Sequence, residues 1–167
     1  MVRARYGTGV FLKYNSSDIY ACINKSNGLL EIPNGVSCIG AFLFLNFDNI
    51  TSAFISNTVS VIEESAFACC YNLSNVTVGK NVRRIENQAF SHCYNLTSIE
   101  LPDSVVYIGK ESFRSCDKLS SVVFGEGIKY IERFAFYKCP NVTLYAKKGS
   151  FVEEYAVKNG LNFKCIE

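Results

Sequence analysis

The cysteines have the greatest capacity for chemistry in this sequence of 167 residues, which contains eight of them. Four of them are evenly spaced along the chain, namely Cys70, Cys93, Cys116 and Cys139. They could be reactive thiols or disulfide partners. Their even spacing indicates a repeating unit, however, and equivalent side chains on neighbouring units point the same way, which is poor geometry for a disulfide. No Cys-x-x-Cys pair occurs, so the usual zinc and redox motifs are absent. We predict that these four are buried free thiols, whereas no such spacing relates Cys22, Cys38, Cys69 and Cys165.

His92 is the only histidine, and the equivalent positions one interval before and after it hold Cys69 and Ser115. Its position therefore varies between repeats, and we expect it to be exposed. A catalytic histidine needs a nucleophile and an orienting partner in a pocket, and neither such a set nor a phosphate-binding glycine loop is evident. We expect no enzymatic activity and no cofactor.

Three glutamates, Glu63, Glu86 and Glu132, share another repeat position, which Gly40 and Gly109 interrupt. Stacked carboxylates could bind a cation. We favour the explanation that they lie at the N-termini of short helical turns, where the helix dipole stabilises negative charge. We expect no metal site.

Seven Asn-x-Ser/Thr sequons begin at Asn15, Asn24, Asn49, Asn72, Asn75, Asn95 and Asn141. In a eukaryotic secreted protein they would be candidates for glycosylation. Three of them, Asn72, Asn95 and Asn141, occupy a single repeat position. This recurrence favours a structural role for these asparagines.

Composition excludes several classes of protein. Hydrophobic residues make up 49% of the chain, and its net charge is +2. The charged residues are scattered along the sequence and do not form the basic stripe of a nucleic-acid-binding protein. No apolar run is long enough to span a membrane. The first nine residues lack the apolar core of a signal peptide, so the chain is either intracellular or, as we prefer, a mature or excised segment.

A single repeat, with the period of the four evenly spaced cysteines, organises the chain. Its pattern is clearest from Val82 to Pro102 and reads Val-x-x-Ile-x-x-x-Ala-Phe-x-x-Cys-x-x-Leu-x-x-Ile-x-Leu-Pro. Residues 59–81, 82–104 and 105–127 follow it closely, 36–58 follow it with substitutions, and a last unit begins at 128 and breaks down after Tyr145. We expect the period to continue without insertion or deletion. Phe67, Phe90, Phe113 and Phe136 should stack as a buried spine.

Within one unit the spacing of apolar residues changes. Val76 and Val78 are two apart, as in a strand with one buried face. Glycine or proline follows this strand and predicts a turn. Residues 82–85 suggest a bend with a short extended piece, and the apolar spacing of three and four over 86–93 predicts about two turns of α or 3₁₀ helix.

The two ends differ from the repeat, and together with it they should form a single domain over residues 1–167. We interpret residues 1–35 as an N-terminal cap with a β-hairpin of 10–14 and 19–23 and a second turn at Asn27-Gly28. About five repeats would occupy 36–146. Residues 147–167 should form a C-terminal cap, with a helix that starts at the capping box Ser150–Glu153, ends at Asn159-Gly160 and precedes a strand.

The pattern from Val82 to Pro102 resembles the BspA-type, or treponemal, leucine-rich repeat, and the resemblance covers about residues 30–146. The segment after Leu144 also looks like the C-terminal cap of gut-bacterial members. The resemblance implies an α/β solenoid, a right-handed and curved coil with a parallel sheet on one face and short helical turns and strands on the other. It also implies a cell-surface or secreted protein, often an adhesin or protein-binding module.

The outward residues of the predicted sheet are the best functional candidates, because packing does not dictate their types. We select Phe54, Asn75, Thr77, Ser98, Glu100, Ser121 and Val123. Phe54 and Val123 are apolar on a face that should meet water, which indicates either an interaction site or simple β-propensity. A rival surface is Arg84, Tyr107 and Tyr130, where cation–π contacts could instead brace the fold.

We therefore expect a monomeric, non-catalytic binding module on or outside a bacterial cell, with a protein or glycan of a host or neighbouring cell as its ligand. We expect no binding to nucleic acid and no insertion into a membrane. Two alternatives remain open at this point. The repeat could be a structural spacer that displays another domain, or an intracellular scaffold for protein interactions.

Overall fold

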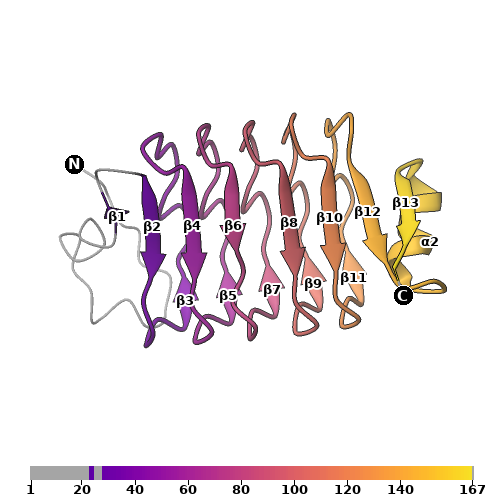
Figure 1. Cartoon of the computed structure of the whole chain (residues 1–167), viewed down its shortest axis with the longest axis horizontal. Coiled ribbons are helices and arrows are strands. Elements are labelled where there is room, and N and C mark those ends of the chain that lie inside the picture. The colour runs from indigo at the N-terminus through magenta and orange to yellow at the C-terminus, as the bar shows by residue number, and fades with distance from the viewer. Residues whose placement is uncertain (1–22, 25–27, 167) are drawn as a thin grey trace.

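The computed structural model describes residues 23–24 and 28–166, which form a solenoid with two sheets and one helix (Figure 1). A long sheet of eight strands has the order β1-β2-β4-β6-β8-β10-β12-β13, and a short sheet of five has the order β11-β9-β7-β5-β3. The long sheet comprises β1 (Ile23–Asn24), β2 (Leu29–Ile32), β4 (Ser52–Ile55), β6 (Asn75–Thr77), β8 (Ser98–Leu101), β10 (Ser121–Phe124), β12 (Thr143–Ala146) and β13 (Asn162–Cys165). The short sheet comprises β3 (Cys38–Ile39), β5 (Val61–Ile62), β7 (Arg84–Ile85), β9 (Tyr107–Ile108) and β11 (Tyr130–Ile131).

Neighbouring strands pair in parallel, except that β1 is antiparallel to β2. In β8 the alternation is clear, since Ser98 and Glu100 are exposed while Ile99 and Leu101 are buried. The two sheets and the turns between them enclose one continuous apolar core. The predicted parallel-sheet solenoid is therefore confirmed.

The predicted phenylalanine spine runs through this core and is longer than expected. Phe44, Phe67, Phe90, Phe113 and Phe136 stack with centroid separations of 5.1, 5.2, 5.5 and 5.4 Å and nearly parallel rings. All five are buried. At roughly 1.5–3 kcal/mol for each large apolar side chain removed from water, the spine is a major source of stability.

The predicted helical turns over residues 86–93 are wrong in detail, because the backbone forms three overlapping β-turns there. The N–H groups of Ala89, Ser91 and Cys93 donate to the carbonyls three residues earlier. Gln88 and His92 have φ of 57° and 61°, the left-handed value found at the third position of type II turns. Apolar spacing of three and four fits such turns as well as it fits a helix, and bonds between coils replace the bonds that a helix would make.

The period also changes once, contrary to the expected absence of insertions and deletions. Leu119 and Val142 are still separated by one full period. Thr143, however, pairs with Ser121, and Leu144 with Val122, so the paired residues are separated by one residue less than the period. One residue is therefore missing just before β12. The reason is that β12 begins the C-terminal cap, where its neighbour is β13 rather than a full coil.

The C-terminal cap has the predicted form, with helix α2 (Phe151–Asn159) followed by β13. Ser150 accepts a hydrogen bond from the Glu153 N–H, and Gly160 has φ of 64° at the helix end. At the other end, the predicted hairpin of 10–14 and 19–23 lies outside the described residues except for Ile23, which belongs to β1. Gly28 has φ of 70° immediately before β2, in keeping with the second turn.

We expect Phe90→Ala to lower the free energy of unfolding by about 3–5 kcal/mol, because it opens a cavity between two neighbouring rings. Denaturant unfolding measures the loss. Phe42→Ala is the control, since Phe42 is exposed and should change stability by no more than about 0.5 kcal/mol. Equal losses in the two variants would contradict the buried spine.

We expect Ser112→Ala to raise the free energy of unfolding by about 1 kcal/mol. Ser112 is fully buried, its Oγ has no hydrogen-bond partner, and alanine stands at the equivalent positions 89 and 135. Thermal and denaturant melts check the gain. Ser91→Ala should have the opposite sign, because the Ser91 Oγ lies 2.8 Å from Nδ1 of His92. A loss of stability in Ser112→Ala would show that this hydroxyl is satisfied.

Candidate functional site

The outward face of the long sheet carries two side chains from each strand, aligned in two rows across the coils. One row places Ser52, Asn75, Ser98 and Ser121 side by side in register. The other row pairs Phe54 with Thr77, and Glu100 with Val123. We call these residues, with the strands that carry them, the sheet face. Parallel strands lie about 4.8 Å apart, so the rows are continuous.

All seven residues selected from the sequence lie on the sheet face. Five are exposed, namely Phe54, Asn75, Thr77, Ser98 and Glu100, and the other two, Ser121 and Val123, are half-buried. Phe54 has 49% of its surface exposed, which is unusual for a phenylalanine on a sheet flanked by polar neighbours. The structure thus brings the candidates together, while their role in binding stays a prediction.

Sequence reasoning missed three residues that extend the sheet face toward the C-terminus. Thr143 and Tyr145 of β12 align with Ser121 and Val123, and Lys164 of β13 aligns with Tyr145. The Lys164 Nζ lies 5.9 Å from the centre of the Tyr145 ring. The missing residue before β12 hid these positions, but the alternation of buried Leu144 and Ala146 with their neighbours could have found them.

The chemistry of the sheet face differs between its two rows. The first row offers small hydroxyl and amide groups, which can donate and accept hydrogen bonds. The second row has acidic residues at Glu31 and Glu100, aromatic rings at Phe54 and Tyr145, and a cation at Lys164. Such a combination can bind an extended ligand through apolar anchors and polar contacts.

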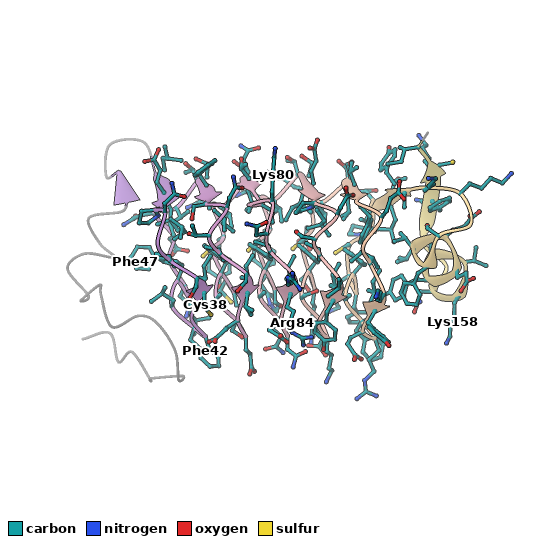
Figure 2. All side chains as sticks on the ribbon, turned by 90° about the horizontal axis from the view of Figure 1, so that it is seen from below. Cys38, Phe42, Phe47, Lys80, Arg84 and Lys158 are labelled. Atoms are coloured by element: carbon teal, nitrogen blue, oxygen red, sulfur yellow. The ribbon has the colours of Figure 1, made fainter. Side chains whose placement is uncertain are left out.

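The rival surface on the short sheet is occupied by contacts within the chain. The Arg84 guanidinium carbon lies 4.0 Å from the centre of the Tyr107 ring, and Arg84 also forms an ion pair with Glu86. Figure 2 shows Arg84 on the same side of the array as Phe42 and on the opposite side from Lys80. Because the Arg84 charge and the Tyr107 ring are already paired, these two residues are better explained as a brace between coils than as a ligand site, whereas Tyr130 is exposed.

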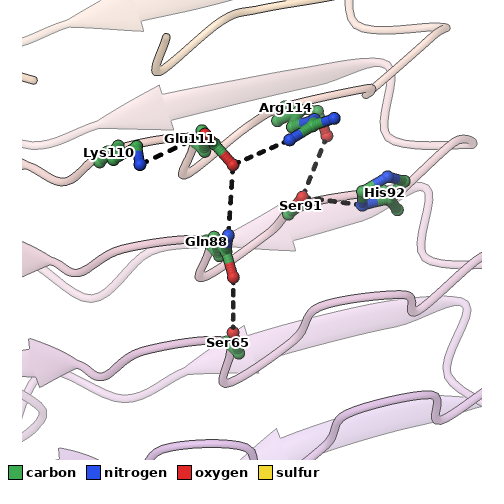
Figure 3. A network of polar contacts seen from close by, with 7 residues as sticks. All are labelled: Ser65, Gln88, Ser91, His92, Lys110, Glu111 and Arg114. Atoms are coloured by element: carbon green, nitrogen blue, oxygen red, sulfur yellow. Dashed lines mark hydrogen bonds and ion pairs between the residues drawn. The ribbon is translucent and has the colours of Figure 1, made fainter. Parts of the chain in front are cut away.

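A polar network crosses three coils on the turns opposite the long sheet (Figure 3). Gln88 donates to Glu111 and contacts Ser65, and Glu111 also forms ion pairs with Arg114 and Lys110. The hydrogen bond from Arg114 lowers the pKa of the Glu111 carboxyl. These contacts join residues from successive coils, which is a structural role.

His92 lies at the edge of this network and is half-buried rather than exposed. Its Nδ1 is 2.8 Å from the Ser91 Oγ, and its ring meets Tyr94 edge-on. No carboxylate contacts its ring in the part of the chain that the structure describes. The arrangement therefore lacks the orienting partner of a catalytic triad.

The cysteine column is buried, as predicted, and each thiol bonds to the backbone of the preceding coil. The Sγ atoms of Cys70, Cys93, Cys116 and Cys139 donate to carbonyls 26 residues earlier over 3.0–3.2 Å. All four are free thiols. Burial raises the pKa of Cys70 from its ordinary value of 9.0 to about 12 and that of Cys93 well above 9.0. A thiol held protonated is a poor nucleophile.

The glutamate column does not lie at helix N-termini, because the turns there are not helical. Glu63 instead accepts hydrogen bonds from the Ala41 N–H and the Cys38 thiol of the preceding coil. Asn72 and Asn95 likewise donate their side-chain amides to carbonyls 24 residues earlier. Glu63 and these two asparagines therefore connect coils.

Within residues 23–24 and 28–166, no group of three or more histidine, cysteine or acidic side chains is placed to hold a metal ion. In the same residues, the single helix falls short of the length and apolar character needed to cross a bilayer.

Comparison with known proteins identifies the repeat. A model of the BspA-type leucine-rich repeat region matches residues 16–143 in six copies, and the match begins inside the segment that we expected to cap the N-terminus. A search of curated proteins found no match.

Several solved structures are similar. A leucine-rich repeat protein of T. pallidum is 26% identical, with a TM-score of 0.69 over 71% of this chain and 58% of its own. One from Bacteroides ovatus is 26% identical, with a TM-score of 0.65 over 89% of this chain and 44% of its own. A leucine-rich cell surface protein of Faecalibacterium prausnitzii, 24% identical, shares the fold with a TM-score of 0.71 over 78% of this chain and 34% of its own. The chain thus spans only about a third to three fifths of their lengths.

We expect the free energy of unfolding to fall as the pH rises above 9. The thiols ionise near pH 9 in the unfolded chain, whereas burial in the folded protein raises the pKa of Cys70 to about 12 and that of Cys93 well above 9.0. The contribution of these protonated thiols to the free energy of unfolding is therefore fully present below pH 9. It declines between pH 9 and 12, by up to about 1.4 kcal/mol per pH unit for each thiol.

Denaturant unfolding at pH 8, 9 and 10 under reducing conditions measures this dependence. Cys93→Ala is the comparison, because it removes one buried thiol and leaves every other titrating group in place. Its stability should fall less steeply above pH 9. Parallel curves for the variant and the wild type would contradict a protonated, buried Cys93.

Proposed function

Because the chain belongs to the BspA-type leucine-rich repeat family, we propose that it is a binding module outside a bacterial cell, and that its sheet face binds a protein or glycan of a host or neighbouring cell. The main support is the contrast between the two faces of the long sheet. Inward positions of the strands are apolar in every coil, whereas the outward row of Phe54, Thr77, Glu100, Val123 and Tyr145 changes in chemical character from coil to coil. Packing does not require this variety.

Repeat solenoids commonly use an extended sheet for large partners, because neighbouring coils supply many weak contacts along one surface. Phe54 and Tyr145 would be the apolar anchors at the two ends, and the hydroxyl and amide row would supply hydrogen bonds between them. The location is supported by family membership and by the F. prausnitzii structure, which is described as a cell surface protein.

A second candidate function is that of a structural spacer. The observation that favours it is the density of contacts between coils, since the cysteine column, Glu63, Asn72 and Asn95 all bond to the preceding coil. A spacer would need stiffness but no particular residue on the sheet face. The two functions therefore differ in their response to substitution of the sheet face.

The test is the double substitution Phe54→Ala with Glu100→Lys. Both side chains are exposed, so the melting temperature should change little. Binding to immobilised extracellular-matrix proteins and to a glycan array would be compared with the wild type. We expect at least a tenfold loss of affinity for whichever of these the wild type binds, because an apolar anchor and a charge are removed.

Phe151→Ala with Glu126→Lys is the matched control, since it makes the same changes at exposed residues that belong to neither row of the sheet face. It should bind like the wild type. Equal binding by wild type and the Phe54/Glu100 variant would exclude the sheet face as the site. No binding by the wild type to either set of probes would favour the spacer.

A further inference from the structure

Exposed aromatic side chains gather on the last coil, on strand β11 of the short sheet and on the turns that follow it. Tyr130, Phe134 and Tyr137 are 65%, 50% and 48% exposed. The residues at the positions of Phe134 and Tyr137 in the coil before are Glu111 and Arg114, which are polar. Stacking of the coils therefore does not require aromatic rings here, and rings of this size are costly to leave in water.

Basic side chains surround these rings. The Arg133 guanidinium lies 6.0 Å from the centre of the Phe134 ring, while the Arg114 guanidinium and the Lys138 Nζ lie 5.7 and 5.9 Å from that of Tyr137. The segment 128–139 contains three basic residues and one acidic residue. We call Tyr130, Arg133, Phe134, Tyr137 and Lys138 the terminal patch, and its charge favours an anionic partner.

In the earlier coils, alternate backbone N–H groups of the turns donate hydrogen bonds to the following coil. The last coil has the same N–H groups, but no full coil follows it. In the coil of residues 82–104, the N–H groups of Gln88, Phe90 and His92 donate to carbonyls spaced two residues apart in the following coil. The equivalent N–H groups at 134, 136 and 138 have no acceptor in the described part of the chain. Helix α2 meets the last coil at Phe136, where the Tyr155 ring packs edge-on with a centroid separation of 6.4 Å.

We propose that the terminal patch binds an acidic polypeptide segment of another protein. Carbonyls of that segment would accept hydrogen bonds from the backbone N–H groups of Phe134 and Lys138, and its carboxylates would pair with Arg133 and Lys138. Phe134 and Tyr137 would supply apolar contact at the centre, as aromatic residues often do in interfaces. This surface is separate from the sheet face, and the proposal does not depend on the function proposed for that face.

The choice of a polypeptide over an anionic glycan rests on the donor row. Within the array, such donors are filled by peptide carbonyls at two-residue spacing, for example those of Lys110, Ser112 and Arg114. A second polypeptide reproduces that spacing, whereas a sugar chain does not. The acidic character rests on Arg133 and Lys138, because Arg114 is already paired with Glu111.

The experiment uses the full chain and a fluorescein-labelled decapeptide that alternates glutamate and leucine, followed by fluorescence anisotropy at low salt. The charge-reversed peptide, which alternates lysine and leucine, is the comparison. We expect the wild type to prefer the acidic peptide. Arg133→Glu with Lys138→Glu should weaken binding at least tenfold, and the amide NMR signals of Phe134 and Lys138 should shift when the peptide is added.

Lys80→Glu with Arg83→Glu is the matched control, because it makes the same change in net charge at exposed residues of the units 59–81 and 82–104. It should keep most of the affinity. If both variants lost the same affinity for the acidic peptide, binding would depend only on the net charge of the protein, and the proposal would be overturned. Binding of heparin without binding of the acidic peptide, or peptide-induced shifts confined to the sheet face, would also overturn it.

Discussion

The regular stacking of this molecule depends on hydrogen bonds between successive coils. Each coil donates and accepts along the long sheet, along the short sheet and along the turns, so every atom of one coil must lie at a fixed offset from its counterpart in the next. An insertion inside a coil would break three sets of bonds at once. The constant period of the central coils follows from this cost, and the single shortening occurs where a full coil no longer follows.

This constraint explains how much could be predicted from the sequence. An inward position has the same surroundings in each coil, so the same residue type recurs, and a periodic phenylalanine predicts a stack of rings. The cysteines behave in the same way, because a small side chain that can donate to the preceding coil suits a fully buried position. The outward residues of the central strands followed from simple alternation, which is why all seven candidates lie on one face.

The sequence was a weaker guide where the same apolar spacing fits two backbones. Spacing of three and four over residues 86–93 suits a helix as well as overlapping turns, and only the bonds between coils decide in favour of the turns. The left-handed residues in those turns are not glycine, so composition gave no warning. Tyr145 and Lys164 were missed because the predicted outward residues ended with β10, and the repeat loses one residue before β12. Local alternation is the better guide where a repeat meets its cap.

The turns give the array a direction that sheets alone would not. In a parallel ladder each strand has donors and acceptors on both edges, but in these turns the alternate N–H groups all point toward the C-terminal side and the carbonyls that receive them belong to the following coil. Two helical turns in this place would have satisfied their own backbone groups internally. The overlapping turns cannot, so a solenoid of this kind must present a row of donors at its C-terminal side. Helix α2 buries the apolar core there with Val152, Tyr155 and Ala156, yet a helix uses its own carbonyls and has few to offer. Capping the core and satisfying the backbone are therefore separate tasks, and this cap performs the first more completely than the second.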